Sequence, residues 1–97
     1  MNYRFTERAQ IEIDYHDHWW RNHRPAAPTL FLEELLKAIQ QAIEQPRLAR
    51  VHDENKRPNV RYIPLPKTRS NLYYAVEPDE VVFLGVDGGA RRRRPQY

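Results

Sequence analysis

The second half of the chain contains three short runs of β-forming residues, at 60–65, 72–77 and 81–86. The turn-forming segments KTRSN at 67–71 and EPDE at 77–80 separate them. Short strands that follow one another through tight turns are typical of an antiparallel meander. The last run, VVFLGV, is apolar throughout and is expected to be the most buried strand.

The order of the strands follows from one proline and from the N-terminus. Pro64 lies inside the run 60–65, and proline cannot donate a hydrogen bond to a neighbouring strand, so this strand is expected at a sheet edge. Residues 3–5, YRF, form a further strand candidate, which then has to pair beside the run 81–86. Residues 47–59 carry mixed charge without periodicity and are expected to form a loop.

Two amphipathic helices are predicted between the first strand and this loop. The first spans about 7–23, with Thr6 as its N-cap and with Ala9, Ile13, His16 and Trp20 at helical spacing. The second starts near Thr29 and ends before Pro46. It carries two adjacent apolar stripes, Leu32, Leu36, Ile39 and Ile43 in one and Phe31, Leu35 and Ala42 in the other. Such width indicates a helix contacted on two sides.

The predicted fold is therefore α+β, with the order β-α-α-β-β-β and a helical hairpin packed on a small antiparallel sheet. A chain of 97 residues has the size of a single domain, here 1–97, with 90–97 as a basic C-terminal tail. Because the tail follows the last buried strand, it is expected to lie outside the core.

Composition limits the class of protein. The absence of cysteine excludes disulfides and thiolate metal sites. No apolar run reaches the roughly 20 residues of a membrane-spanning helix, and the N-terminus lacks the apolar core of a signal peptide, so a cytoplasmic protein without membrane contact is expected.

Charge is distributed unevenly along the chain. Residues 1–44 carry 5 basic and 7 acidic side chains, whereas residues 45–97 carry 11 basic and 6 acidic ones. An excess of positive charge in one half favours an anionic or acidic partner.

Four segments carry a resemblance to a known family. They are FTERA at 5–9, WWRNHRP at 19–25, FLEELLKAIQQAIEQP at 31–46, and VRYIPLPKTRSNLYYAVEPDEVVFLGV at 60–86, which four arginines follow at 91–94. In this order and spacing, the chain resembles the RelE/ParE superfamily of toxins from bacterial type II toxin-antitoxin modules and leans toward the ParE-like branch. The resemblance implies a compact toxin that a cognate antitoxin wraps and inactivates.

The two branches of the superfamily imply different targets. ParE-like toxins, known from plasmid stabilisation, poison DNA gyrase and arrest growth, and this is the function expected here. RelE-like toxins are ribosome-dependent mRNA endonucleases, for which Arg61, Lys67 and Arg91 would contact phosphate. A third alternative is a degenerate toxin that only binds its antitoxin and regulates its operon.

One departure from the nuclease pattern bears on this choice. Many relatives carry a histidine just after the last strand, where this chain has Asp87-Gly88-Gly89. The missing histidine counts against a nuclease and leaves an aspartate or a tyrosine as the remaining candidate base.

Basic and aromatic residues of the second half are the candidates for contact with a target or partner. Arg61 has apolar neighbours, so its charge must reach water, a carboxylate or a ligand. Tyr73 and Tyr74 face opposite sides of their strand, which places one in the core and one on the exposed face. The arginine run is either a solvated end or a contact surface. The candidates are Arg61, Lys67, Arg69, Tyr73, Arg91, Arg92, Arg93 and Arg94.

The first helix contains histidines and tryptophans with two interpretations each. His16 and His23 lie seven residues apart without a metal-binding motif, so no native metal site and no cofactor are expected, and His16 is expected to face the core or to be half-buried. Trp19 and Trp20, near Arg21 and Arg24, either form a stacking platform for bases or supply core packing, at least through Trp20.

Overall fold

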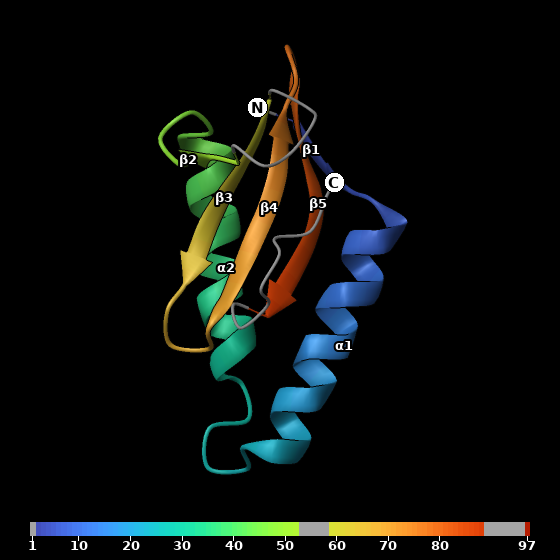
Figure 1. Ribbon diagram of the computed structural model, residues 1–97, viewed down its shortest axis with the longest axis vertical. Helices are drawn as coiled ribbons and strands as arrows, with labels where there is room; N and C mark the ends of the chain where they lie inside the picture. The colour runs from blue at the N-terminus through green and yellow to red at the C-terminus, as the bar shows by residue number, and fades with distance from the viewer. Residues whose placement is uncertain (1, 53–58, 89–96) are drawn as a thin grey trace.

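The computed structural model describes residues 2–52, 59–88 and 97. Five strands form one sheet in the order β1-β5-β4-β3-β2, and two helices lie on it. In Figure 1, α2 lies behind β3 and β4, and α1 lies beside β5. The α+β class and the order of strand, two helices and strands are confirmed. The elements are β1 (Asn2–Phe5), α1 (Glu7–His23), α2 (Leu30–Glu44), β2 (Arg50–Val51), β3 (Val60–Leu65), β4 (Ser70–Val76) and β5 (Glu80–Gly88).

The sheet is mixed rather than antiparallel throughout. The pairs of β3 with β4 and of β4 with β5 are antiparallel, as predicted. β1 does pair with β5, also as predicted, but it runs parallel, from Asn2 opposite Glu80 to Phe5 opposite Phe83. Two helices and three strands separate β1 from β5 in sequence, so no tight turn forces this pair to be antiparallel.

The edge beside β3 differs from its prediction. Arg50 and Val51 form the two-residue strand β2 inside the expected loop and pair with Tyr62 and Arg61. The edge prediction for the run 60–65 is therefore wrong for its first half, where β2 covers β3. Pro64 lies beyond the residues that β2 pairs, so its missing N–H leaves no ladder bond unmade on that side.

The main core lies on the sheet face toward the helices. α2 contributes Phe31, Leu35, Ala38 and Ala42, all buried against inward-facing residues of β3, β4 and β5. The stripe of Leu32, Leu36, Ile39 and Ile43 is less buried, and Leu36 within it is 56% exposed. The predicted contact on two sides is thus complete only for the stripe that faces the sheet.

The start of α1 is held by a cap that also reaches the sheet. The Thr6 hydroxyl oxygen accepts a bond from the Ala9 N–H at 3.0 Å, which confirms the predicted N-cap. The same hydroxyl lies 3.3 Å from the Leu84 carbonyl oxygen, to which it donates. Among the described residues, no helix combines the length and apolar character that crossing a membrane requires.

Arg61 and Tyr74 anchor the segment that follows α2 to the sheet. The Tyr74 hydroxyl donates to the Pro46 carbonyl at 2.7 Å, and the Arg61 guanidinium donates to the carbonyls of Ala49 and Arg47 at 2.8 and 3.1 Å. Tyr74 is fully buried, and this burial raises its pKa to about 12, an effect that the positive charge of Arg61 only partly offsets.

The raised pKa predicts a loss of stability at alkaline pH. The folded protein holds the Tyr74 proton more tightly than the unfolded chain, so this stabilisation is complete below pH 10.0, the unperturbed pKa, and is lost as the pH rises through about 12. We expect Tyr74→Phe to cost about 1 kcal/mol at neutral pH through the lost bond to Pro46, but to show a shallower decline above pH 10.0. Denaturant unfolding of both proteins at neutral pH and above pH 10.0 measures this difference.

Tyr15→Phe is the matched control, because the Tyr15 side chain is 66% exposed. It should keep the pH dependence of the parent protein. A Tyr74→Phe protein whose stability falls with pH as steeply as that of the parent would contradict the interpretation.

Candidate functional site

The sheet face opposite α2 carries a cluster of aromatic rings centred on Tyr73. The Tyr73 ring lies 5.1 Å from His52, 5.9 Å from Tyr62 and 4.8 Å from Tyr97, measured between centroids. Tyr73 and Tyr74 do face opposite sides of β4, but both are fully buried. The prediction that one of them is exposed is therefore wrong, because His52 and Tyr97 cover the second face of the sheet.

Tyr97 docks on this face at a site built by α1 and β5. Its hydroxyl donates to Glu12 Oε1 at 3.1 Å, and the Arg8 guanidinium carbon lies 4.1 Å from the ring centroid. A Cβ at Gly85 would meet both the Glu12 carboxylate and the Tyr97 ring, so only glycine leaves room for this arrangement. Burial, followed by the nearby Glu12 carboxylate, raises the pKa of Tyr97 well above its usual range.

The docking of Tyr97 corrects the prediction for the C-terminal tail. Tyr97 packs against a second apolar cluster, formed by Val60, Ala75, Val82 and Leu84, so the last residue belongs to the fold. The candidates Arg91, Arg92, Arg93 and Arg94 lie outside the described residues.

Glu12 has a second task at the edge of β5. β1 pairs with β5 only as far as Phe83, and beyond it the Val86 N–H donates to Glu12 Oε1 at 3.0 Å. One carboxylate oxygen thus accepts from the strand edge and from Tyr97.

Near the end of β5, Asp87 is buried, and the Asn71 side-chain amide donates to its Oδ1 at 3.3 Å.

Arg61 lies on the other face of the sheet from Tyr73. Side chains alternate along a strand, and Ile63 and Leu65 of β3 belong to the core on the helix side, so Arg61 shares their face. Its guanidinium bonds to the two backbone carbonyls after α2 described above. The structure therefore does not bring Arg61 together with Tyr73, although both were predicted for one contact surface.

Lys67 and Arg69 lie at the opposite end of β3, in the turn before β4. Glu34 of α2 holds this turn, because its carboxylate accepts from the Lys67 N–H at 2.8 Å, the Thr68 N–H at 3.1 Å and the Thr68 hydroxyl at 2.7 Å. The side chains of Lys67 and Arg69 line a hollow together with Trp19, Trp20 and Arg24. The predicted residues are thus distributed over three places.

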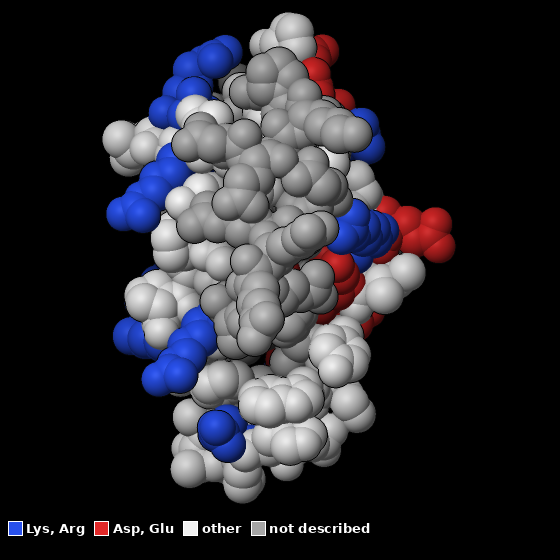
Figure 2. Space-filling view, viewed as in Figure 1, with Lys and Arg blue, Asp and Glu red and all other residues white. Residues whose placement is uncertain are grey.

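Positive charge collects along one margin of the molecule. In Figure 2, most of the visible Lys and Arg side chains follow the side where Figure 1 places β2 and β3, while most Asp and Glu side chains, with a few basic ones among them, lie on the opposite side, near α1. The expected charge asymmetry between the two halves of the sequence is therefore also an asymmetry in space. Among the described residues, no three His, Asp or Glu side chains come together as a metal site.

Sequence reasoning missed the parts of the site that depend on contacts across the fold. In the sequence, Glu12 and Glu34 are ordinary carboxylates on predicted helices, and Tyr97 is a terminal residue. Only Gly85 carried a usable signal, because a glycine inside an apolar strand indicates close approach of another group. His16, as predicted, is half-buried, and its ring stacks on Phe31 at 5.7 Å.

Comparison with known proteins gives a family match over nearly the whole chain. Residues 3–93 match the model of the ParE toxin of the type II toxin-antitoxin system parDE. A chain from the chromosomal ParDE TA system of P. aeruginosa is similar in structure, with a TM-score of 0.74 and 18% identity over 91% of this chain and 95% of that one. The isolated E. coli RelE toxin has a TM-score of 0.62 and 23% identity over 93% and 85%.

At these identities, the two solved structures show a shared fold and nothing finer. No curated protein matches the chain significantly.

The docking of Tyr97 predicts different costs for two glycine substitutions. Gly85→Ala places a methyl group where the Glu12 carboxylate and the Tyr97 ring lie, which displaces Glu12 from the Val86 N–H. We expect a loss of about 1–2 kcal/mol in the free energy of unfolding, the usual cost of an unsatisfied buried donor. Gly88→Ala is the matched control, because nothing lies within 4 Å of its added Cβ. Equal melting temperatures for the two variants would contradict the assignment.

Proposed function

The chain belongs to the ParE toxin family of type II toxin-antitoxin systems, and from this premise we propose that it inhibits DNA gyrase and that a cognate antitoxin neutralises it. The match of residues 3–93 to that family carries the proposal. The shared fold covers almost the full length of both this chain and the P. aeruginosa ParDE chain.

Two residues that could act as the base of a nuclease, Asp87 near the end of β5 and Tyr97, are poorly suited to that role. Asp87 is buried and engaged by Asn71. The Tyr97 hydroxyl donates a hydrogen bond to Glu12, and its raised pKa keeps the phenol neutral. A general base has to be deprotonated and within reach of the substrate proton. Both observations favour a toxin that acts by binding over one that cleaves mRNA.

The basic residues proposed for the nuclease alternative are also separated. Arg61 bonds to backbone carbonyls near the C-terminal end of α2, whereas Lys67 lies in the turn held by Glu34. Stabilising the charge that develops on one phosphate requires donors aimed at one point. Arg91, the third residue of that set, lies outside the described residues.

For contact with gyrase, we propose the basic residues of the second half. The run Arg91–Arg94 is the main element, and Lys67, Arg69 and Arg61 are proposed as further contacts. Tyr73 contributes indirectly, as the buried ring on which Tyr97 rests. Four adjacent positive charges suit an acidic protein surface or a DNA backbone within the target complex.

Charge reversal in the arginine run tests this proposal. We expect the purified protein to inhibit gyrase supercoiling, and Arg91→Glu with Arg92→Glu to weaken that inhibition by roughly tenfold or more, as for charged groups at an interface. Replacement of the same two residues by lysine should have a smaller effect. Keeping Tyr97 in place is essential, because truncation would also remove its packing on the sheet.

Lys37→Glu provides the control for a change of charge elsewhere, since Lys37 is exposed on α2. Normal supercoiling in the presence of excess folded protein would refute the proposal. Codon-positioned mRNA cuts on translating ribosomes would then favour the nuclease, and neither activity would favour the degenerate toxin that only binds its antitoxin.

The antitoxin is proposed to bind an apolar groove between the two helices. This groove has a volume of about 360 Å³, and its apolar lining consists of Phe5, Ile13, Leu32, Leu35, Leu36 and Ile39. Leu36 is 56% exposed at its rim. An amphipathic helix can insert apolar side chains into such a groove, while acidic residues of the same partner meet the basic margin of the sheet.

A polar substitution at the groove should weaken antitoxin binding without unfolding the toxin. We expect Leu36→Asp to lower antitoxin affinity by roughly tenfold or more, because it places a charge in an apolar contact. Thermal melting should change little, since Leu36 is exposed in the free protein. Leu48→Asp is the control, as Leu48 is 67% exposed and does not line the groove. Calorimetric titration with the antitoxin compares the two, and equal losses of affinity would contradict the groove as the binding site.

A further inference from the structure

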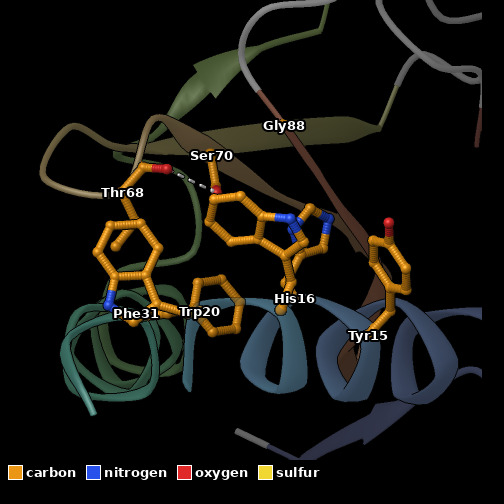
Figure 3. Close-up of a pocket in the computed structure, with 8 residues that line it drawn as sticks. Tyr15, His16, Trp20, Phe31, Thr68, Ser70 and Gly88 are labelled. Atoms are coloured by element: carbon orange, nitrogen blue, oxygen red, sulfur yellow. Dashed lines mark hydrogen bonds between the residues drawn. The ribbon is translucent and has the colours of Figure 1, made fainter. Parts of the chain in front are cut away.

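A second cavity, separate from the antitoxin groove, lies between α1, the start of α2 and the sheet. It has a volume of about 330 Å³, within the roughly 300–1,000 Å³ typical of small-molecule sites. Figure 3 shows Tyr15, His16, Trp20 and Phe31 on the helix side of the cavity and Thr68, Ser70 and Gly88 on its sheet side. With Trp19, these five aromatic side chains form the cavity wall. We call this cavity, together with the hollow that adjoins it, the tryptophan cleft.

The adjoining hollow adds positive charge. It measures about 450 Å³ and shares Trp19, Trp20 and Thr68 with the cavity, while Arg24, Lys67 and Arg69 complete its lining. Among the described residues that line the two parts of the cleft, none is acidic. The side chains of Lys67 and Arg69 form no ion pair or hydrogen bond within the described part of the chain. The cleft therefore combines an aromatic interior with the side chains of Lys67 and Arg69, with which no described carboxylate forms an ion pair.

The walls of the cleft are held in place before any ligand binds. Trp20 donates its indole N–H to the Ala27 carbonyl at 2.6 Å, and the Trp19 ring stacks on His23 at 4.5 Å. On the other side, Glu34 fixes the turn of Lys67 and Thr68 through three hydrogen bonds. A preformed wall lowers the entropic cost of binding.

Arg69 occupies a backbone conformation that is unfavourable for an arginine. Its φ of 54° lies in the left-handed region, and it is the only non-glycine residue with positive φ in the described part of the chain. Glycine or asparagine would adopt this conformation at lower cost. The strain supports a role for the arginine side chain itself, beyond forming the turn.

The hydroxyl groups on the sheet side indicate what kind of ring fits. Thr68 donates its hydroxyl proton to Glu34, and Ser70 donates its own to the Thr68 carbonyl at 3.3 Å. Their oxygens can then only accept from a ligand, because a hydroxyl has a single proton to donate. A ring that presents an amino group meets this requirement.

From these contacts we infer that the tryptophan cleft binds a nucleoside phosphate, with an amino-bearing base among the aromatic side chains and the phosphate against Lys67, Arg69 and Arg24. Base stacking on aromatic rings and charge-assisted bonds from Lys and Arg are the interactions by which proteins hold such ligands. A free nucleotide and a nucleotide of a single strand present the same chemistry. The inference does not rest on gyrase as the target.

Tryptophan fluorescence of the full chain tests the inference directly, because the only two tryptophans of the sequence both line the cleft. We expect AMP to quench the emission saturably. Adenosine lacks the phosphate and should bind on the order of tenfold more weakly, because it loses a charge-assisted bond. IMP lacks the amino group and should also bind more weakly, because it loses a neutral hydrogen bond. No saturable quenching by AMP, or equal binding of AMP and adenosine, would overturn the inference.

Three variants, Lys67→Glu, Arg69→Gly and Gly88→Leu, and one control separate binding from folding. Lys67→Glu should weaken AMP binding on the order of tenfold, whereas Lys37→Glu, the same change on an exposed part of α2, should not. Arg69→Gly should weaken binding without lowering the melting temperature, since glycine relieves the positive φ. Gly88→Leu should block the cavity that Gly88 lines, where an added Cβ meets nothing within 4 Å. AMP binding that survives all three would refute the site.

A single-stranded oligoadenylate identifies the source of the ligand. Tighter binding than AMP, lost in Gly88→Leu, would assign the cleft to a nucleic-acid strand, and binding no tighter than AMP would assign it to the free nucleotide. Oligonucleotide binding that Gly88→Leu leaves unchanged, in a protein that does not bind AMP, would mean attraction to surface charge alone and would overturn the inference.

Discussion

The structure depends on the hydrogen bonding of β5 along both of its edges. β4 pairs with one edge over the length of the strand, but β1 covers the other only through Phe83. Beyond that point, side chains of α1 replace a neighbouring strand: Thr6 reaches the Leu84 carbonyl, and Glu12 accepts from the Val86 N–H. A buried backbone group without a partner is costly, so these bonds fix where α1 lies.

The position of α1 then organises both faces of the sheet. On one face, α1 and α2 close the main core around Phe31, Leu35 and Phe83. At the edge toward the other face, the Glu12 carboxylate that satisfies β5 also receives the Tyr97 hydroxyl, above a glycine that leaves the space. The C-terminal residue is thus tied to the same carboxylate that holds the first helix, and loss of Glu12 would affect both.

The two regions proposed for binding lie at different places on this framework. The groove proposed for the antitoxin lies where the outer stripe of α2 meets α1 and remains partly unburied, because the sheet can cover only one stripe of that helix. The tryptophan cleft lies at the turn between β3 and β4, where Glu34 of α2 holds Lys67 and Thr68 against the end of α1. Their separation means that an antitoxin in the groove and a ligand in the cleft contact different residues.

The local order of the sequence was sufficient for the helices and for four of the five strands, all but β2. The bounds of α1 followed from Thr6 and from the apolar spacing before Pro25, and Pro46 marked the end of α2. These signals act within a few residues, so they can be read without knowing what lies nearby in space. The family resemblance rested on the same segments and was confirmed over residues 3–93.

Only the tertiary structure decided the features that join distant residues. The parallel direction of β1, the short β2 and the burial of Tyr73 each require a partner far away in the chain. The same holds for the site: Arg61 and Lys67 are near in sequence but are held by different groups, while Glu12 and Tyr97 are separated by 85 residues and share a hydrogen bond. The sequence alone determined which residues favour helix, strand and charge. Their grouping into sites depended on long-range packing and on buried polar groups finding partners, which local pattern does not encode.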